Sequence, residues 1–234
     1  MTLPTAAVAG GLLGILLVVG AGPAFRSGAP LLVGFGVLGV GVLLGLLGAI
    51  AGIAALVVGF RRGLPLSPAT VTGVILGLIA FGVPFQRVWS ARSLPAIHDI
   101  STDLTAPPTF QAVVPLRAAA PNSLTINPAD APKQRAAYPD LAPLLLDKPP
   151  GDVFDRAVDA ARDMDWEIVS ADRAAGRIEG TATTRWFGFK DDIVVRLAPT
   201  ATGTRVDVRS VSRIGVGDLG TNANRIRDYL ARLR

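Results

Sequence analysis

The chain has 234 residues, half of them hydrophobic, with a net charge of +5, no cysteine and one histidine. This composition excludes disulfides, thiolate metal sites, cysteine nucleophiles and a metal site built from several histidines of one chain. The first 90 residues hold four arginines and no acidic residue, whereas residues 151–234 hold fourteen basic and thirteen acidic residues. Nucleic acid is therefore not an expected partner, because a nearly neutral C-terminal region attracts phosphate backbones only weakly.

Residues 1–92 form the predicted membrane anchor. Three charge-free stretches each offer the roughly 20 apolar residues that a helix needs to cross the hydrocarbon core. They predict helices at about 6–22, 31–58 and 69–88. The middle stretch exceeds a minimal span, which predicts a tilted or protruding helix. A cleaved signal peptide is the alternative for the first stretch, but the basic start of such peptides is missing. The lipid bilayer is thus the first expected partner.

Glycines recur four residues apart in the predicted spans, as in Gly10/Gly14 and Gly73/Gly77. Small residues at this spacing let helix backbones approach closely in lipid. A glycine-rich segment also produces such spacings by chance. The spacing favours packing of three helices within one chain over dimerisation, and it leaves the oligomeric state open.

Arginines at the ends of the spans determine the expected orientation. Three spans place the loop of Arg61 and Arg62 on the side of the N-terminus, and Arg26, Arg87 and Arg92 on the side of the C-terminal domain. Basic residues in short loops favour the cytoplasmic side. The adjacent pair in one short loop favours a cytoplasmic loop, which predicts a C-terminal domain outside the cytoplasm.

Residues 93–150 are rich in proline and show little apolar periodicity, which predicts an extended tether with at most a helical turn near 138–146. His98 lies just beyond the last span, and Asp99 and Asp103 could join it in a weak metal site. A solvated or hydrogen-bonded histidine is the favoured interpretation. No metal and no cofactor is predicted.

Residues 151–234 form the predicted C-terminal domain. It opens with a helix whose apolar face is Phe154, Ala157, Val158 and Ala161. Four runs then alternate with a period of two, and glycine-containing turns separate them. A last helix follows Gly217, with Asp218 as its expected cap and an apolar stripe of Leu219, Ala223, Ile226, Leu230 and Leu233.

The order of helix, four strands and helix predicts an α+β domain: a four-stranded antiparallel sheet with two helices on one face. The expected core residues are Trp166, Ile178, Val195, Val208, Ile226 and Leu230. The opposite face of the sheet carries Glu179, Asp192, Arg196, Asp207 and Arg209. This face is interpreted either as a solvated layer of cross-strand ion pairs or as a polar binding surface.

Several motifs resemble the bacterial domain of unknown function numbered 1499. They are Ile-His-Asp-Ile-Ser-Thr-Asp at 97–103, Arg-Trp-Phe-Gly-Phe-Lys-Asp-Asp at 185–192, Asp-Val-Arg-Ser-Val-Ser-Arg at 207–213 and Gly-Asp-Leu-Gly-Thr-Asn-Ala-Asn-Arg-Ile at 217–226. The resemblance covers roughly residues 95–233, and similar members often carry three membrane spans before the domain. It implies a multi-pass protein of the bacterial inner (cytoplasmic) membrane, and it implies no established activity.

The last motifs concentrate polar residues that form the candidate binding or structural cluster. Its members are Arg185, Asp191, Asp192, Arg209, Ser210, Arg213, Asp218, Asn222 and Arg225. Bidentate arginine–carboxylate pairs within it would fix the last helix to the sheet, and this structural interpretation is favoured over an open ligand site. Trp186 and Phe187 are candidate exposed aromatics for partner contact, but core packing is the slightly favoured interpretation of the pair.

No catalytic residue is assigned. Asp191 and Asp192 are neighbours on a strand and point to opposite faces, so they cannot act together on one bond. The expected function is therefore a membrane protein that presents a small binding or envelope-structural module, with an envelope protein as a candidate partner. The alternative is a membrane-bound, metal-dependent hydrolase or lipid-modifying enzyme that uses Asp191 or Asp192.

Overall fold

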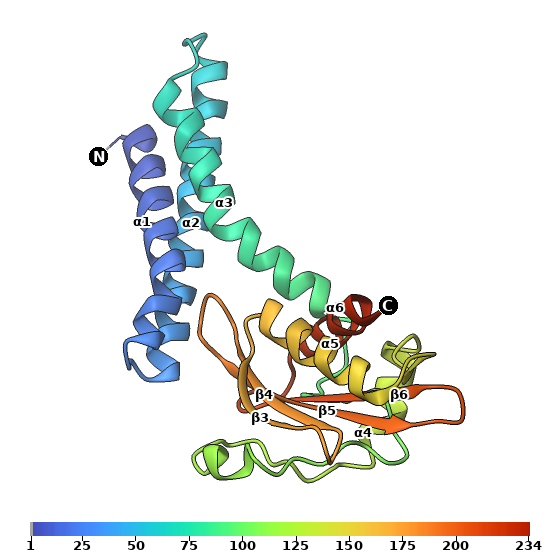
Figure 1. The fold of residues 1–234 in the computed structure, drawn as a ribbon. Helices are drawn as coiled ribbons and strands as arrows, with labels where there is room; N and C mark the ends of the chain where they lie inside the picture. The colour runs from blue at the N-terminus through green and yellow to red at the C-terminus, as the bar shows by residue number, and fades with distance from the viewer. Residues whose placement is uncertain (1) are drawn as a thin grey trace. The chain divides into compact units, whose positions relative to one another are not determined.

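The computed structural model describes residues 2–234, which form two compact units (Figure 1). The first unit holds the residues up to Arg92 together with the short segment Arg185–Gly188. The second holds Ser93–Thr184 and Phe189–Arg234. Residues 93–150, expected to be a tether, are therefore part of the same unit as the C-terminal domain.

The first unit is built on the helices α1 (Leu3–Arg26), α2 (Leu31–Arg61) and α3 (Pro68–Ala91). At about 1.5 Å per residue, a helix of 24 residues such as α1 or α3 is about 36 Å long, which exceeds the roughly 30 Å of a bilayer core. All three helices are long and apolar enough to cross a membrane. The three predicted apolar helices are confirmed, and each runs a few residues beyond its predicted end. The length and composition of these helices suggest a membrane protein.

Glycines form the contacts between these helices. A Cβ atom added to Gly77 of α3 would lie 2.5 Å from the backbone nitrogen of Ala49 in α2. One added to Gly14 of α1 would lie 2.8 Å from the backbone nitrogen of Gly45. Gly82, five residues after Gly77 in α3, faces open space. The four-residue spacing therefore serves close packing of helices within the chain.

The second unit is built on one antiparallel sheet of six strands, with the order β1-β6-β5-β4-β3 and with β2 also paired to β6. The strands are β1 (Asp99–Ser101), β2 (Leu144–Leu146), β3 (Glu167–Asp172), β4 (Arg177–Thr183), β5 (Lys190–Pro199) and β6 (Thr204–Ser212). The prediction of four strands is wrong, because β1 and β2 come from the proline-rich segment. Each has three residues, too few to show an alternating pattern.

Two helices cover one face of the sheet, α5 (Pro150–Asp163) and α6 (Thr221–Leu233) (Figure 1). All six residues predicted for the core are buried there: Trp166, Ile178, Val195, Val208, Ile226 and Leu230. The apolar faces predicted for the two helices are also buried, except for Leu219, which lies before α6 and is exposed. The α+β class and the two helices on one face are confirmed.

Residues 103–127 cover the other face of the sheet. This segment contains the short 3-10 turn η1 (Val114–Arg117), and the helix α4 (Asp130–Ala137) follows it. Phe110 and Val113 pack on Val194 and Val211 of the sheet in a second, smaller apolar cluster. The polar face that the sequence presented as solvated or open to a partner is therefore buried under the chain itself.

Candidate functional site

Asp192 is the centre of the polar face beneath residues 103–127. It lies on β5 and is fully buried. Arg213 binds its carboxylate in a bidentate fork, with Nε 2.9 Å from Oδ2 and Nη2 2.8 Å from Oδ1. The hydroxyl of Thr181 on the neighbouring strand β4 donates to Oδ1 at 2.7 Å. Arg117 of η1, itself buried, donates to Oδ2 from above.

The charge state of Asp192 follows from these partners. Burial raises the pKa of its carboxyl, but hydrogen bonds from Arg213, Thr181 and Arg117 outweigh that effect and hold the pKa below its ordinary value. The carboxylate therefore stays ionised, and its acceptor positions are occupied by its own chain. A group held in this way fixes the covering segment to the sheet.

Two further buried charges hold the same segment. Glu179 is fully buried, and its carboxylate accepts the backbone N–H groups of Gln111 at 2.9 Å and Val113 at 3.0 Å. Arg209 forms a bidentate pair with Asp99, at 2.9 Å through Nε and 2.7 Å through Nη2. Nη2 of Arg209 also donates to the carbonyl of Leu124, at 2.8 Å. The polar face thus binds backbone and side chains of the segment above it.

The helix side of the sheet carries four further members of the predicted cluster, namely Asp191, Ser210, Asn222 and Arg225. Asp191 pairs with Arg225 of α6 at 2.6 Å, and the hydroxyl of Ser210 donates to Oδ1 of Asn222 at 2.7 Å. The amide of Asn222 donates to the carbonyl of His98 at 3.1 Å. The structure therefore divides the predicted cluster between the two faces, with Asp191 and Asp192 pointing to opposite sides.

Asp218 lies just before α6 and caps it. Its carboxylate accepts the backbone N–H groups of Gly220 at 2.9 Å and Asn222 at 2.6 Å. Burial raises the pKa of Asp218, and the nearby charge of Asp191 adds to that rise against the lowering effect of the two backbone bonds. Helix α6 begins at Thr221 and Gly220 is its N-cap residue, so the prediction of Asp218 as the N-cap is wrong. Asp218 binds the start of the helix from two residues before that position.

Trp186 and Phe187 belong to the helical unit. Phe187 is buried, with its ring 6.0 Å from that of Phe25 and 5.4 Å from that of Phe35, so the expectation that it is exposed is wrong. Trp186 is 41% exposed, and its indole N–H donates to the carbonyl of Val19 at 3.2 Å. That carbonyl has no helical partner, because residue 23, four positions on, is a proline. Arg185 is the remaining member of the predicted cluster, and its backbone carbonyl accepts a hydrogen bond from the guanidinium of Arg26 at 2.9 Å.

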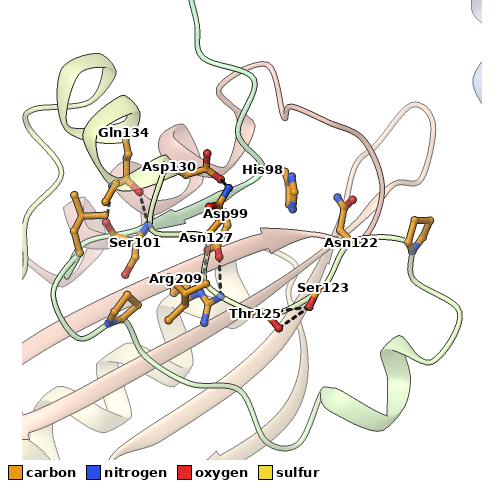
Figure 2. Close-up of a pocket in the computed structure, with 15 residues that line it drawn as sticks. His98, Asp99, Ser101, Asn122, Ser123, Thr125, Asn127, Asp130, Gln134 and Arg209 are labelled. Carbon is orange, nitrogen blue, oxygen red and sulfur yellow. Dashed lines mark hydrogen bonds and ion pairs between the residues drawn. The ribbon is translucent and has the colours of Figure 1, made fainter.

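A cavity of about 320 Å³ opens beside the Asp99–Arg209 pair (Figure 2). Its walls come from β1, the loop at 121–127, α4 and β6. The side chains with polar groups at the cavity include His98, Asp99, Asn122, Thr125, Asp130 and Arg209. A more open hollow of about 620 Å³ shares Arg209 and four residues of the loop with the cavity, namely Asn122, Ser123, Thr125 and Ile126.

The cavity wall mixes acceptors with donors. His98 is half-buried, and one ring nitrogen, Nδ1, lies 3.4 Å from the carbonyl of Val216. Asp130 carries the ammonium of Lys133 at 2.8 Å, and Ser123 donates its hydroxyl to Thr125 at 2.9 Å. The two carboxylates at the cavity, those of Asp99 and Asp130, are thus each paired with a cation. The wall is close to neutral and offers both hydrogen-bond donors and hydrogen-bond acceptors.

Comparison with protein families supplies one match. Residues 99–233, more than half of the chain, match the model of a family described as protein of unknown function (DUF1499). The chain belongs to this family. No curated protein and no solved structure matches it at a significant level. The DUF1499 region begins at β1 and ends in α6, so it includes both faces of the sheet and every residue that lines the cavity except His98.

Metal ligation finds little support in the DUF1499 region. Over residues 2–234, no group of three histidine, cysteine, aspartate or glutamate side chains is placed to hold an ion. Asp103, considered as a partner of His98, instead accepts from Arg196 at 3.0 Å and from Arg205 at 2.8 Å. Burial raises the pKa of Asp103, but backbone and arginine hydrogen bonds lower it below its ordinary value.

Sequence reasoning missed the residues of the covering segment. Arg117 lies in an alanine- and proline-rich stretch with no charge pattern around it, and its partner Asp192 is 75 positions away. Asn122, Asn127 and Asp130 form a polar run in the sequence that could have indicated a loop with exposed polar side chains. Nothing in that run indicates that it lines a cavity together with Arg209.

Proposed function

We propose that this DUF1499 protein is a membrane-anchored binding module that takes a small, neutral, hydroxyl-rich ligand, of the size of a sugar unit, into the cavity beside His98. The observation that carries the proposal is the cavity itself, about 320 Å³ in volume and lined by polar side chains from four segments. Small-molecule pockets in proteins range from about 300 to 1,000 Å³, so this one accommodates a single small unit.

The charge of the wall supports a neutral ligand. Asp99 is bound by Arg209 at 2.7 Å, and Asp130 is bound by Lys133 at 2.8 Å, so neither carboxylate is left to attract a cation. The guanidinium of Arg209 is likewise occupied and does not offer an anion site. Hydroxyl groups both donate and accept hydrogen bonds, and they match a wall that presents His98 and Thr125 beside carboxylate oxygens.

The membrane anchor supports a role at the bilayer surface. We propose the bacterial inner membrane as its location, with the DUF1499 domain outside the cytoplasm, because Arg61 and Arg62 favour a cytoplasmic loop between α2 and α3. The module then works in the cell envelope, where saccharide units and polyols are carried on lipids and polymers.

The hydrolase alternative gains no support from the two carboxylates on which it rested. Asp191 is bound by Arg225 at 2.6 Å on the helix side, and Asp192 is bound by Arg213 at 2.8 Å on the other side. Neither lines the cavity. A catalytic carboxylate must reach the reacting bond, and both of these are bound by arginines of their own chain.

Saturation-transfer NMR on the full-length protein in nanodiscs tests the proposal. The probes are glucose, N-acetylglucosamine and glycerol, with choline and inorganic phosphate as charged comparisons. We expect saturable contact with at least one hydroxylated probe, lost in His98→Ala and Thr125→Val and kept in Arg135→Ala. Arg135 is the matched control, because it lines a different hollow of the same unit. Binding of the charged probes alone, or equal binding by all variants, would refute the proposal.

A further inference from the structure

The loop between β6 and α6 exposes two large apolar side chains. Val216 is 78% exposed and Leu219 is 64% exposed. In the second unit, only Leu145 among the described large apolar residues is comparably exposed, at 68%. Large apolar side chains that lie together at a surface mark contact sites for other molecules or for membranes.

The conformation of the loop keeps these side chains outside. Gly215 and Gly220 have positive φ angles of 102° and 80°, which let the chain turn sharply. Leu219 also has a positive φ, 52°, a conformation that leucine rarely adopts. Asp218, between the two apolar residues, directs its carboxylate inward to the backbone of Gly220 and Asn222. The loop thus presents Val216 and Leu219 outward and withdraws its one charge.

The chain connection limits how far this loop can lie from the end of α3. Within the second unit, the backbone N–H of Asp218 donates to the carbonyl of Ile97 at 3.3 Å. A Cβ on Gly217 would lie 3.3 Å from the Cα of Ala96. Ala96 is five residues beyond Ala91, the last residue of α3, and five residues span at most about 18 Å.

The end of α3 has the character of a membrane boundary. The guanidinium of Arg92 stacks on the ring of Trp89, 3.4 Å from its centroid. Tryptophan and arginine gather where a span leaves the hydrocarbon and enters the headgroup layer. A segment tied to Ala96 therefore lies within reach of that layer, whatever the orientation of the two units.

We propose that the loop of residues 215–220 is a membrane-contact loop, with Val216 and Leu219 inserted in the headgroup region of the bilayer that α3 crosses. The occupant of this apolar surface is lipid, because the covalent connection holds the loop near the bilayer. The inference rests on the side chains of Val216 and Leu219, neither of which lines the proposed ligand cavity.

Site-directed spin labelling of the full-length protein tests this inference. The chain has no cysteine, so Val216→Cys, Leu219→Cys and Leu145→Cys each create a single labelling site. Leu145 is the matched control, because it pairs with Arg205 of β6. Arg205 lies seven residues before Ser212, the end of β6, which is roughly 20 Å along the strand from the point where the loop begins. The labelled proteins are placed in nanodiscs of palmitoyl-oleoyl phosphatidylcholine, and collisions with oxygen and with a water-soluble nickel chelate are measured.

We expect a several-fold higher ratio of oxygen to nickel collisions at positions 216 and 219 than at 145, because oxygen concentrates in lipid and the chelate in water. An equal ratio at the three sites would overturn the inference. Low collision rates with both reagents at 216 and 219 would also overturn it, because that result indicates cover by protein. Positions 216 and 219 are labelled in separate proteins, so one still tests the inference if the label at the other disturbs the fold.

Discussion

Replacing Asp192 by alanine tests how the covering segment is held on the sheet. The substitution leaves Arg117, whose side chain is 5% exposed, and Arg213 without their shared carboxylate. Removing one partner of a buried ion pair costs about 3–5 kcal/mol, because an uncompensated charge remains buried. Arg117 keeps a bond to the carbonyl of Asn122 at 2.9 Å, and Arg213 is partly exposed, so we expect a cost near the lower end, about 3 kcal/mol.

Pulse proteolysis of the full-length protein in urea measures this cost. With a urea dependence of about 1.5–2 kcal/mol per molar, a loss of about 3 kcal/mol lowers the unfolding midpoint by about 1.5–2 M. Asp163→Ala is the matched control, because Asp163 is exposed at the end of α5. A midpoint for Asp192→Ala that stays as close to wild type as the control would refute the account of the buried cluster.

The contribution of the Asp192 carboxylate to the free energy of unfolding should depend on pH in a defined direction. The pKa of Asp192 is lower in the folded protein than the ordinary value of about 3.9. Its contribution to stability is therefore present above that value and is lost as the pH falls through the folded pKa. We expect the gap between wild type and Asp192→Asn to be constant near neutral pH and to close in acid. A gap that closes instead above pH 5 or so would contradict this assignment.

Three further predictions concern topology and packing. A reporter fused after Arg92 should be active if it works only outside the cytoplasm. Activity of a reporter that works only in the cytoplasm would show the opposite orientation. Leu230→Ala should cost about 2–5 kcal/mol in pulse proteolysis, whereas exposed Leu145→Ala should change stability by less than about 0.5 kcal/mol. Gly77→Ala should lower the thermal midpoint in detergent well below that of Gly82→Ala, since only the former meets a neighbouring backbone, and equal midpoints would contradict the helix packing.

Periodicity predicted the elements that have one face on the main core. Helix α5 and the strands β4–β6 each carry apolar residues at the spacing of their own type, and these residues are buried, whereas Ile168 of β3 packs against the core half-buried. Strands β1 and β2 gave no such signal, because Asp99–Ser101 and Leu144–Leu146 are too short to show alternation. Their place on β6 depends on pairing with distant residues, which a local pattern does not encode.

The candidate site was predictable only where the pairs are close in the sequence. Asp192 lies on β5 and Arg213 directly follows β6, the next strand of the same hairpin, so their pairing follows from the hairpin. Asp99 is 110 positions from Arg209, and no local pattern joins them. Polar residues on alternate positions of a sheet normally indicate a solvated face. Here residues 103–127 cover and bind these polar residues, so the alternating pattern wrongly predicted that they are exposed to solvent.

The pairing of β6 has a consequence for where the domain can be cut. A strand at the edge of a sheet exposes unpaired backbone groups that recruit other chains and lead to aggregation. In this protein β1 and β2 cover most of the outer side of β6, and Thr102 binds the backbone of Val208 between them. The side chain of Gln134 then binds both backbone groups of Ser101, at 3.0 and 2.6 Å. A fragment that begins after residue 103 would expose this edge, so expression trials of the isolated domain should start before Asp99.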